Sequence, residues 1–238
     1  MNLKSKIAGF FLGLIVIVSC SNDDATKQET LPNGIAKKLK ILAVGDSYTI
    51  GESVCESCRF PRQLQEKLAL EFEEEISLKI IAKTGWTTSN LKTAIEDEEL
   101  NPEYDLVTLL IGVNNQYQHK PFSLYQQEFP ELLRKAIALA KGNKAHVIVV
   151  SIPDYAYTPF GQNYSNPTII SAEIDNYNEF AKNYSLQNGV EFVNITDITR
   201  LGLEDPTLVA SDGLHPSELA YKNFVERILP FAKQKIKN

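Results

Sequence analysis

Short segments rich in apolar residues alternate along this chain with longer segments whose apolar residues recur at helical spacing, and no other feature constrains the fold as strongly. The apolar segments, which are predicted as β-strands, are residues 40–44, 76–82, 105–111, 146–152 and 190–195. The predicted helices are residues 60–73, 88–98, 123–141, 171–187 and 216–235. Strands that are apolar on both faces and joined by helices form parallel sheets covered on both sides. The sequence therefore predicts an α/β domain of flavodoxin-like type, with a five-stranded parallel sheet between two layers of helices.

The first twenty residues depart from this pattern and are typical of a secretory signal. Two lysines precede the apolar stretch Ile7–Val18, whose twelve residues are too few for a membrane-spanning helix, which needs about 20. The residues that lead up to Cys20 resemble the end of a bacterial lipoprotein signal. The resemblance implies that residues 1–20 are the signal, that Cys20 carries lipid, and that the protein is anchored to a membrane of the bacterial cell envelope. An ordinary cleaved signal with an incidental cysteine is the alternative.

Residues 21–37 are polar and contain a Pro-Asn-Gly turn signal, so we expect a flexible tether that leads to a folded domain at 38–238. Acidic residues number 30 against 24 basic ones, which gives a net charge of -6 and argues against a nucleic-acid-binding protein. The three cysteines are too few for a disulfide-dense scaffold or a four-thiolate zinc site, and no metal site is expected.

Polar and small residues follow the predicted strands where those strands end. Gly45-Asp46-Ser47-Tyr48 follows the first strand, Thr84-Gly85-Trp86 the second, and Gly112-Val113-Asn114-Asn115 the third, while Asp212 and His215 lie in a Gly-containing turn before the last helix. Parallel sheets bind ligands at the carboxyl ends of their strands. These four segments are therefore the candidate functional site.

A serine in such a place becomes a nucleophile only if a base removes its proton, and an imidazole oriented by a carboxylate does this. The chain has three histidines. We expect His146, at the start of a strand, to be structural and His119 to be a surface residue, whereas His215 follows Asp212 by three residues in a compact turn. Candidate donors to an oxyanion are the backbone N–H groups of Ser47 and Gly85 and the side-chain amide of Asn114.

Together, the four segments resemble the SGNH, or GDSL-type, hydrolase family over about residues 39–230. They match, in order, the nucleophile, glycine, asparagine and final blocks of that family. The resemblance implies a three-layer α/β/α fold and an enzyme that needs no metal or organic cofactor. The site residues that it implies are Ser47 as nucleophile, His215 as base, Asp212 as its orienting partner, and Ser47, Gly85 and Asn114 as the oxyanion hole.

The chain departs from the family pattern at three positions. Tyr48 replaces a frequent Leu, Thr84 a frequent Asn, and Asn115 a frequent Asp. None of these changes removes a group that performs chemistry. We expect Tyr48, Trp86 and Asn115 to contact substrate, with a core aromatic as the alternative for Trp86.

Residues 154–170 form a long predicted loop rich in aromatic residues, and loops of this length are often functional. Its aromatic side chains, which we expect to form a rim or to pack over the domain, are Tyr155, Tyr157, Phe160 and Tyr164. Cys55 and Cys58 follow the nucleophile segment. In an oxidising compartment a small disulfide is expected between them, and free thiols or a redox or metal role are the alternatives.

The resemblance implies a serine esterase that hydrolyses carboxylic esters through an acyl-enzyme. Its substrate is expected to be a small-molecule or glycan ester, with removal of acetyl or other acyl groups from glycans as one prediction. A lysophospholipase or a general short-chain esterase is the alternative. Two alternatives belong to other functional classes. One is a non-catalytic glycan-binding lipoprotein, and the other is a flavodoxin-like module that binds phosphate through Ser47, Thr49 and Ser53.

Overall fold

The computed structural model describes residues 38–237, and the five strands in this part of the chain form one parallel sheet. The strands are β1 (Leu39–Gly45), β2 (Ile76–Ala82), β3 (Leu106–Leu110), β4 (Val147–Val150) and β5 (Glu191–Val193). Their order in the sheet is β2-β1-β3-β4-β5, so β1 pairs with β2 on one side and with β3 on the other. The predicted α/β fold with a five-stranded parallel sheet is confirmed.

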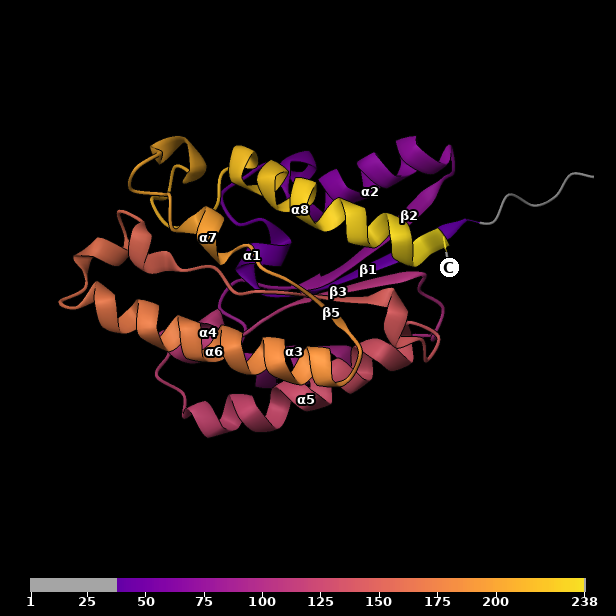
Figure 1. Cartoon of the computed structure of the whole chain (residues 1–238), viewed down its shortest axis with the longest axis horizontal. Helices are drawn as coiled ribbons and strands as arrows, with labels where there is room; N and C mark the ends of the chain where they lie inside the picture. Colours follow the sequence, from indigo (N-terminus) through magenta and orange to yellow (C-terminus); the bar gives the residue numbers. More distant parts are fainter. Residues whose placement is uncertain (1–37, 238) are drawn as a thin grey trace, which may run out of the picture. The chain divides into compact units, whose positions relative to one another are not determined.

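Long helices cover both faces of the sheet (Figure 1). The helices α2 (Phe60–Phe72) and α8 (Glu218–Lys237) pack against each other on one face. The helices α3 (Thr88–Asp97), α5 (Phe122–Leu139) and α6 (Pro167–Gln187) lie on the other. All five residues of β3 are buried, because this central strand has a helical layer on each side. The alternation of apolar and helical segments thus produces a core on both faces of the sheet.

Three short helices were not predicted: α1 (Ser47–Ile50), α4 (Val113–Tyr117) and α7 (Thr196–Thr199). A helix of four or five residues is too short to show an apolar period in the sequence. Two of them, α1 and α4, directly follow β1 and β3, which are neighbours in the sheet. They bring the candidate nucleophile and the candidate amide donor to the same edge.

The long loop after β4 is also more ordered than predicted. It contains two turns of 3₁₀-helix, η3 (Tyr155–Tyr157) and η4 (Gly161–Asn163). Helix α6 begins at Pro167, four residues before the predicted start at residue 171, because the Asn166 side chain caps it and proline is well suited to the first turn.

The predicted signal, the lipid-bearing Cys20 and the tether at 21–37 lie outside the described residues, and these assignments stay predictions. Within residues 38–237, no helix combines the length and the apolar composition that crossing a membrane requires.

Candidate active site

Ser47 lies at the point where β1 ends and α1 begins. The preceding residue, Asp46, caps this helix, because its side chain accepts a hydrogen bond of 3.1 Å from the Tyr48 N–H. Ser47 is 3% exposed and lines a cavity of about 310 Å³. The order of the strands changes direction next to β1, and such a switch point is where open α/β sheets bind their ligands.

Asp212 and His215 are bound to each other in the turn before α8. The His215 Nδ1 lies 2.6 Å from Asp212 Oδ2, while Asp212 Oδ1 accepts hydrogen bonds from the backbone N–H groups of Leu214 (2.9 Å) and His215 (3.0 Å). The hydroxyl of Ser53 donates a further bond of 2.6 Å to Asp212 Oδ2. Burial alone would raise the pKa of Asp212, but the bonds from Ser53 and His215 lower it to about 2. The carboxylate is therefore charged at neutral pH and fixed at both oxygens.

The turn that carries this pair is closed by backbone hydrogen bonds. The Ala210 N–H donates to the His215 carbonyl at 2.7 Å, and Val209 forms an isolated antiparallel bridge with Pro216. The turn is also tied to the loop after β4, because the Phe160 N–H donates to the Gly213 carbonyl at 2.9 Å.

One cavity brings together most of the predicted site. Its wall is built by segments that follow β1, β2, β3 and β4 and by the turn before α8, and the lining residues are Ser47, Tyr48, Thr84, Gly85, Val113, Asn114, Tyr117, Tyr155, Phe160, Leu214 and His215. The candidate nucleophile, the candidate base and all three candidate oxyanion donors are thus in one place. Asp212 lies behind His215, where the bond to Nδ1 orients the ring.

Gly85 occupies the third position of a tight turn, in which the Trp86 N–H donates to the Lys83 carbonyl at 3.2 Å. Its φ is +82°, a backbone conformation that glycine adopts without the steric cost a side chain imposes. Apart from Gly85 and its two neighbours in the chain, no described heavy atom lies within 4 Å of the place where a Cβ would be. The backbone at Gly85 is therefore open to a molecule in the cavity.

Asn114 lies in the first turn of α4, and its side-chain nitrogen, Nδ2, is buried without a hydrogen-bond partner among the described residues. The amide is near enough to Asp46 to lower the pKa of that carboxyl, although no bond of normal geometry joins them. Asn114 itself lines the cavity, so its side chain lies next to the space that a bound molecule would occupy.

Asp46 is completely buried, and its Oδ2 has no hydrogen-bond partner among the described residues. Burial raises its pKa to about 7, against the opposing effects of the Tyr48 N–H and the Asn114 amide. The folded protein therefore holds the proton of Asp46 over a pH range in which the unfolded chain has already released it.

This difference predicts a pH-dependent cost to stability. In the linkage relation, the state that binds more protons is favoured at low pH, so Asp46 favours the folded state below about pH 4 and loses this advantage as the pH rises to about 7. In Asp46→Ser, the serine hydroxyl can accept the capping hydrogen bond in place of the carboxylate, and the variant has no ionisable group at this position. Urea unfolding at pH 4, 5.5 and 7.5 should show that the stability of the variant improves relative to the wild type as the pH increases. A constant difference between the two proteins at all three pH values would contradict this account.

The structure corrects two of the predicted substrate contacts. Asn115 is fully buried and does not line the cavity; its amide is bound to Thr88, because residues 114 and 115 of a helix point about 100° apart. Trp86 also lies outside the cavity and lines a separate surface hollow with Ile81 and Ala94. The third predicted contact, Tyr48, does line the cavity, and its ring lies 5.1 Å from that of His215.

Aromatic side chains form one wall of the cavity. Two members of the predicted rim, Tyr155 and Phe160, line it, and Tyr164 contacts Phe160 at a ring separation of 5.7 Å. Tyr157 does not line it and lies beneath the guanidinium of Arg200, at 5.9 Å. Tyr117 was not predicted, although it follows Asn114 by three residues, a spacing that places two residues on one side of a helix.

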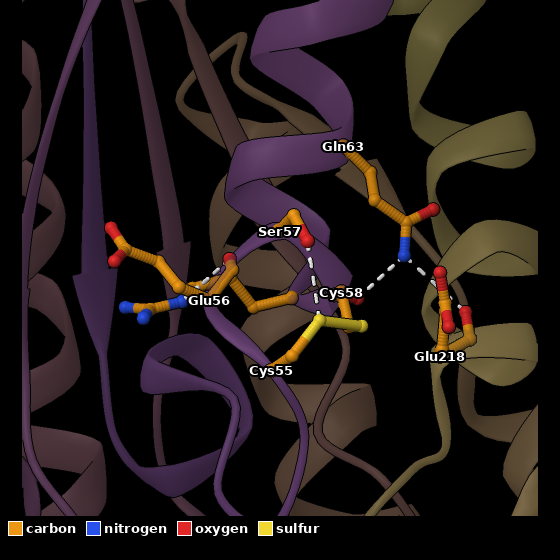
Figure 2. Close-up of a disulfide and its surroundings, with 7 residues drawn as sticks. Cys55, Glu56, Ser57, Cys58, Gln63 and Glu218 are labelled. Carbon is orange, nitrogen blue, oxygen red and sulfur yellow. Dashed lines mark hydrogen bonds between the residues drawn. A yellow bond between two sulfur atoms is a disulfide. The ribbon is translucent and has the colours of Figure 1, made fainter.

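Cys55 and Cys58 form the disulfide that was expected, which excludes the free-thiol alternative in this structure. Figure 2 shows how the disulfide turn is held: the Gln63 side-chain amide donates to the carbonyl of Cys58 at 2.5 Å and to that of Glu218, at the start of α8, at 3.3 Å. Among residues 38–237, no three His, Cys, Asp or Glu side chains are grouped as a metal site requires.

The other two histidines are not part of the cavity wall. His119 is an exposed residue with a φ of +53°, and His146 lies 3.2 Å from the Asn143 amide. Neither lines the cavity, so His215 is the imidazole that the fold brings to Ser47.

Solved structures share the fold at low sequence identity. A lipase/acylhydrolase from Enterococcus faecalis superposes with a TM-score of 0.64 at 19% identity, over 83% of this chain and 96% of that one. A lipolytic protein of the G-D-S-L family from Veillonella parvula gives 0.61 and 18%, over 81% and 97%. An acetylxylan esterase from Geobacillus stearothermophilus gives 0.57 and 18%, over 84% and 94%. No curated protein sequence matches the chain significantly.

A serine, a carboxylate-bound histidine and N–H donors around one cavity at the carboxyl edge of an α/β sheet are the groups with which serine hydrolases work. A family model described as GDSL-like lipase/acylhydrolase matches residues 43–222, and the chain belongs to this family. The protein is an esterase or acylhydrolase of the SGNH/GDSL type.

Proposed function

We propose that the protein is a serine esterase in which Ser47 attacks the carbonyl carbon of a carboxylic ester. His215 takes the hydroxyl proton, and the Asp212 carboxylate stabilises the resulting imidazolium. His215 then passes this proton to the leaving alcohol, and water, activated by the same imidazole, hydrolyses the acyl-enzyme. The observation that carries the proposal is that Ser47 and His215 line one cavity while Asp212 binds the Nδ1 atom of the His215 ring.

The oxyanion hole consists, in this proposal, of the N–H groups of Ser47 and Gly85 and the Asn114 amide. The open space beside the Gly85 backbone and the position of Asn114 on the cavity wall support these roles. Such donors stabilise charge that develops only in the transition state, so they act on kcat more than on KM.

We expect Asn114→Ala to reduce kcat by about 10²–10³-fold, the usual effect of removing one oxyanion donor, with KM changed little. Steady-state kinetics with a p-nitrophenyl ester give both constants, and Asn176→Ala is a matched control outside the cavity wall. A variant that keeps the wild-type kcat would remove Asn114 from the oxyanion hole.

The substrate is proposed to be an ester with a small acyl group and an apolar or ring-shaped neighbour. Tyr117, Tyr155 and Phe160 give the cavity an aromatic wall, and such surfaces suit sugar rings and acyl chains alike. Removal of acetyl or other acyl groups from glycans of the cell envelope fits this wall together with a lipid anchor at Cys20. A general short-chain esterase or a lysophospholipase fits the same wall.

Two measurements test the proposal. A fluorophosphonate probe should label the wild type covalently and should not label Ser47→Ala, whereas a non-catalytic glycan-binding protein would not react at all. A series of p-nitrophenyl acyl esters, acetylated xylo- and chito-oligosaccharides and a lysophospholipid then ranks the substrates. Labelling that persists in Ser47→Ala would place the nucleophile elsewhere.

A further inference from the structure

Helix α4 and its C-cap residue, Gln118, bind the segment of residues 85–88 at both of its ends. The Asn115 Oδ1 accepts a hydrogen bond of 2.9 Å from the Thr88 N–H, and the Asn115 Nδ2 donates to Thr88 Oγ1 at 2.7 Å. One turn further along the chain, Gln118 Nε2 donates to the Gly85 carbonyl at 2.8 Å. The stretch from residue 85 to residue 88 is thus attached to the helix that also carries Asn114.

We propose that Asn115 and Gln118 are positioning residues that fix the Gly85 N–H relative to the Asn114 amide. This inference rests on the oxyanion hole of the proposed function. Neither residue lines the cavity, so the proposed role is an indirect one. Both act through α4, which holds one donor on its own first turn and the other through these hydrogen bonds.

The buried part of this network has a fixed hydrogen-bond direction. The Thr88 N–H can only donate, so the oxygen of the Asn115 amide faces it and the nitrogen faces Thr88 Oγ1. The Thr88 hydroxyl in turn donates to Glu128 Oε2 at 2.5 Å. Glu128 is 5% exposed, and Ser89 Oγ lies 2.8 Å from each of its oxygens. An amide at 115 is therefore required, because its N–H donates to Thr88 Oγ1 and leaves the hydroxyl proton of Thr88 for Glu128.

An aspartate at 115, the residue frequent at this position in the family, would break this chain. In Asn115→Asp two buried carboxylates compete for the one hydroxyl proton of Thr88, so one carboxylate oxygen faces the hydroxyl oxygen without a proton between them. We expect kcat to fall about 10- to 100-fold while KM changes little. The displaced donor, the Gly85 N–H, stabilises the oxyanion of the transition state and contributes little to binding of the substrate. Undiminished kcat in a folded Asn115→Asp protein would overturn the role of Asn115.

A second substitution should restore the network with its direction reversed. When Asn115→Asp is combined with Glu128→Gln, the new carboxylate can accept from both the N–H and the hydroxyl of Thr88, and the new amide can donate to Thr88 Oγ1. We expect the double variant to recover at least half of the lost kcat on a logarithmic scale. A purely structural role predicts a lower Tm with normal kcat in the folded fraction. Additive losses in the double variant would refute the chain of donors.

Gln118 is exposed, so it can be substituted with little effect on folding. Gln118→Ala removes the bond to the Gly85 carbonyl, and because water can replace part of it, we expect kcat to fall only about threefold. Gln127→Ala, at an exposed position on α5, is the matched control and should retain the wild-type kcat. Equal kcat in the two variants would exclude Gln118 from positioning.

The parent proposal and this inference fail in different ways. If Ser47→Ala keeps its activity, the serine mechanism itself is wrong. If Ser47→Ala is inactive but both Asn115→Asp and Gln118→Ala match the wild type in kcat, the mechanism stands and only the positioning role is lost.

Discussion

Ser47→Ala is expected to reduce turnover of a short p-nitrophenyl ester by at least about 10⁴-fold, because it removes the proposed nucleophile and with it the acyl-enzyme. Ser47 is almost fully buried at the start of α1 and lines the cavity, so the substitution removes one oxygen atom without disturbing the surroundings. Residual activity would come from substrate binding and the remaining oxyanion donors alone. The measurement is kcat/KM from initial rates.

The unfolding midpoint of Ser47→Ala should stay near that of the wild type, which separates lost chemistry from lost structure. Ser57→Ala, which changes a serine in the exposed disulfide turn, is the matched control and should retain full activity. Turnover by Ser47→Ala within tenfold of the wild type would rule out Ser47 as the nucleophile.

Asp212→Asn is expected to reduce kcat by about 10³–10⁴-fold, even though it changes only one atom of the carboxylate. The backbone N–H groups of Leu214 and His215 both donate to Oδ1, so they require an oxygen at that position in the variant as well. The new NH₂ group must then face His215 Nδ1, which becomes an acceptor. The ring proton moves to Nε2, and the imidazole can no longer take a proton from Ser47.

The tautomer of His215 distinguishes this explanation from simple misfolding. ¹⁵N NMR of the imidazole should show the proton on Nδ1 in the wild type and on Nε2 in Asp212→Asn, with the signals of His119 and His146 unchanged. Low activity without a change of tautomer would mean that Asp212 acts in another way.

The sequence was a reliable guide to the long elements and to the chemical groups at the ends of the strands. All five strands were predicted: β1, β3 and β4 are central and mostly apolar, and the edge strands β2 and β5 still contain several apolar residues. The four motif segments follow from the topology of the sheet. The helices α1, α4 and α7 were missed because they contain too few residues to display a period. Because these helices were not predicted, the directions of their side chains could not be predicted either.

The wrong prediction for Asn115 has this same cause. Asn115 was grouped with Asn114, but adjacent residues of a helix face different surroundings, and only one of the two borders the cavity. The hydrogen bond from Ser53 to Asp212 could not have been predicted, because the two residues are 159 positions apart in the chain. Ser53 is also exposed, so no periodic pattern of apolar residues indicates where its side chain lies. Contacts between distant loops depend on exact loop geometry, which residue types alone do not specify.

The hydrogen bond from the Phe160 N–H to the Gly213 carbonyl has a consequence for engineering this enzyme. The loop that provides much of the aromatic wall is coupled through its main chain to the residues between Asp212 and His215. A loop grafted from a relative in order to alter substrate preference must therefore reproduce the backbone position of residue 160 as well as present new side chains. Grafts that omit this constraint would lose turnover on every ester, whichever acyl group they were designed to accept.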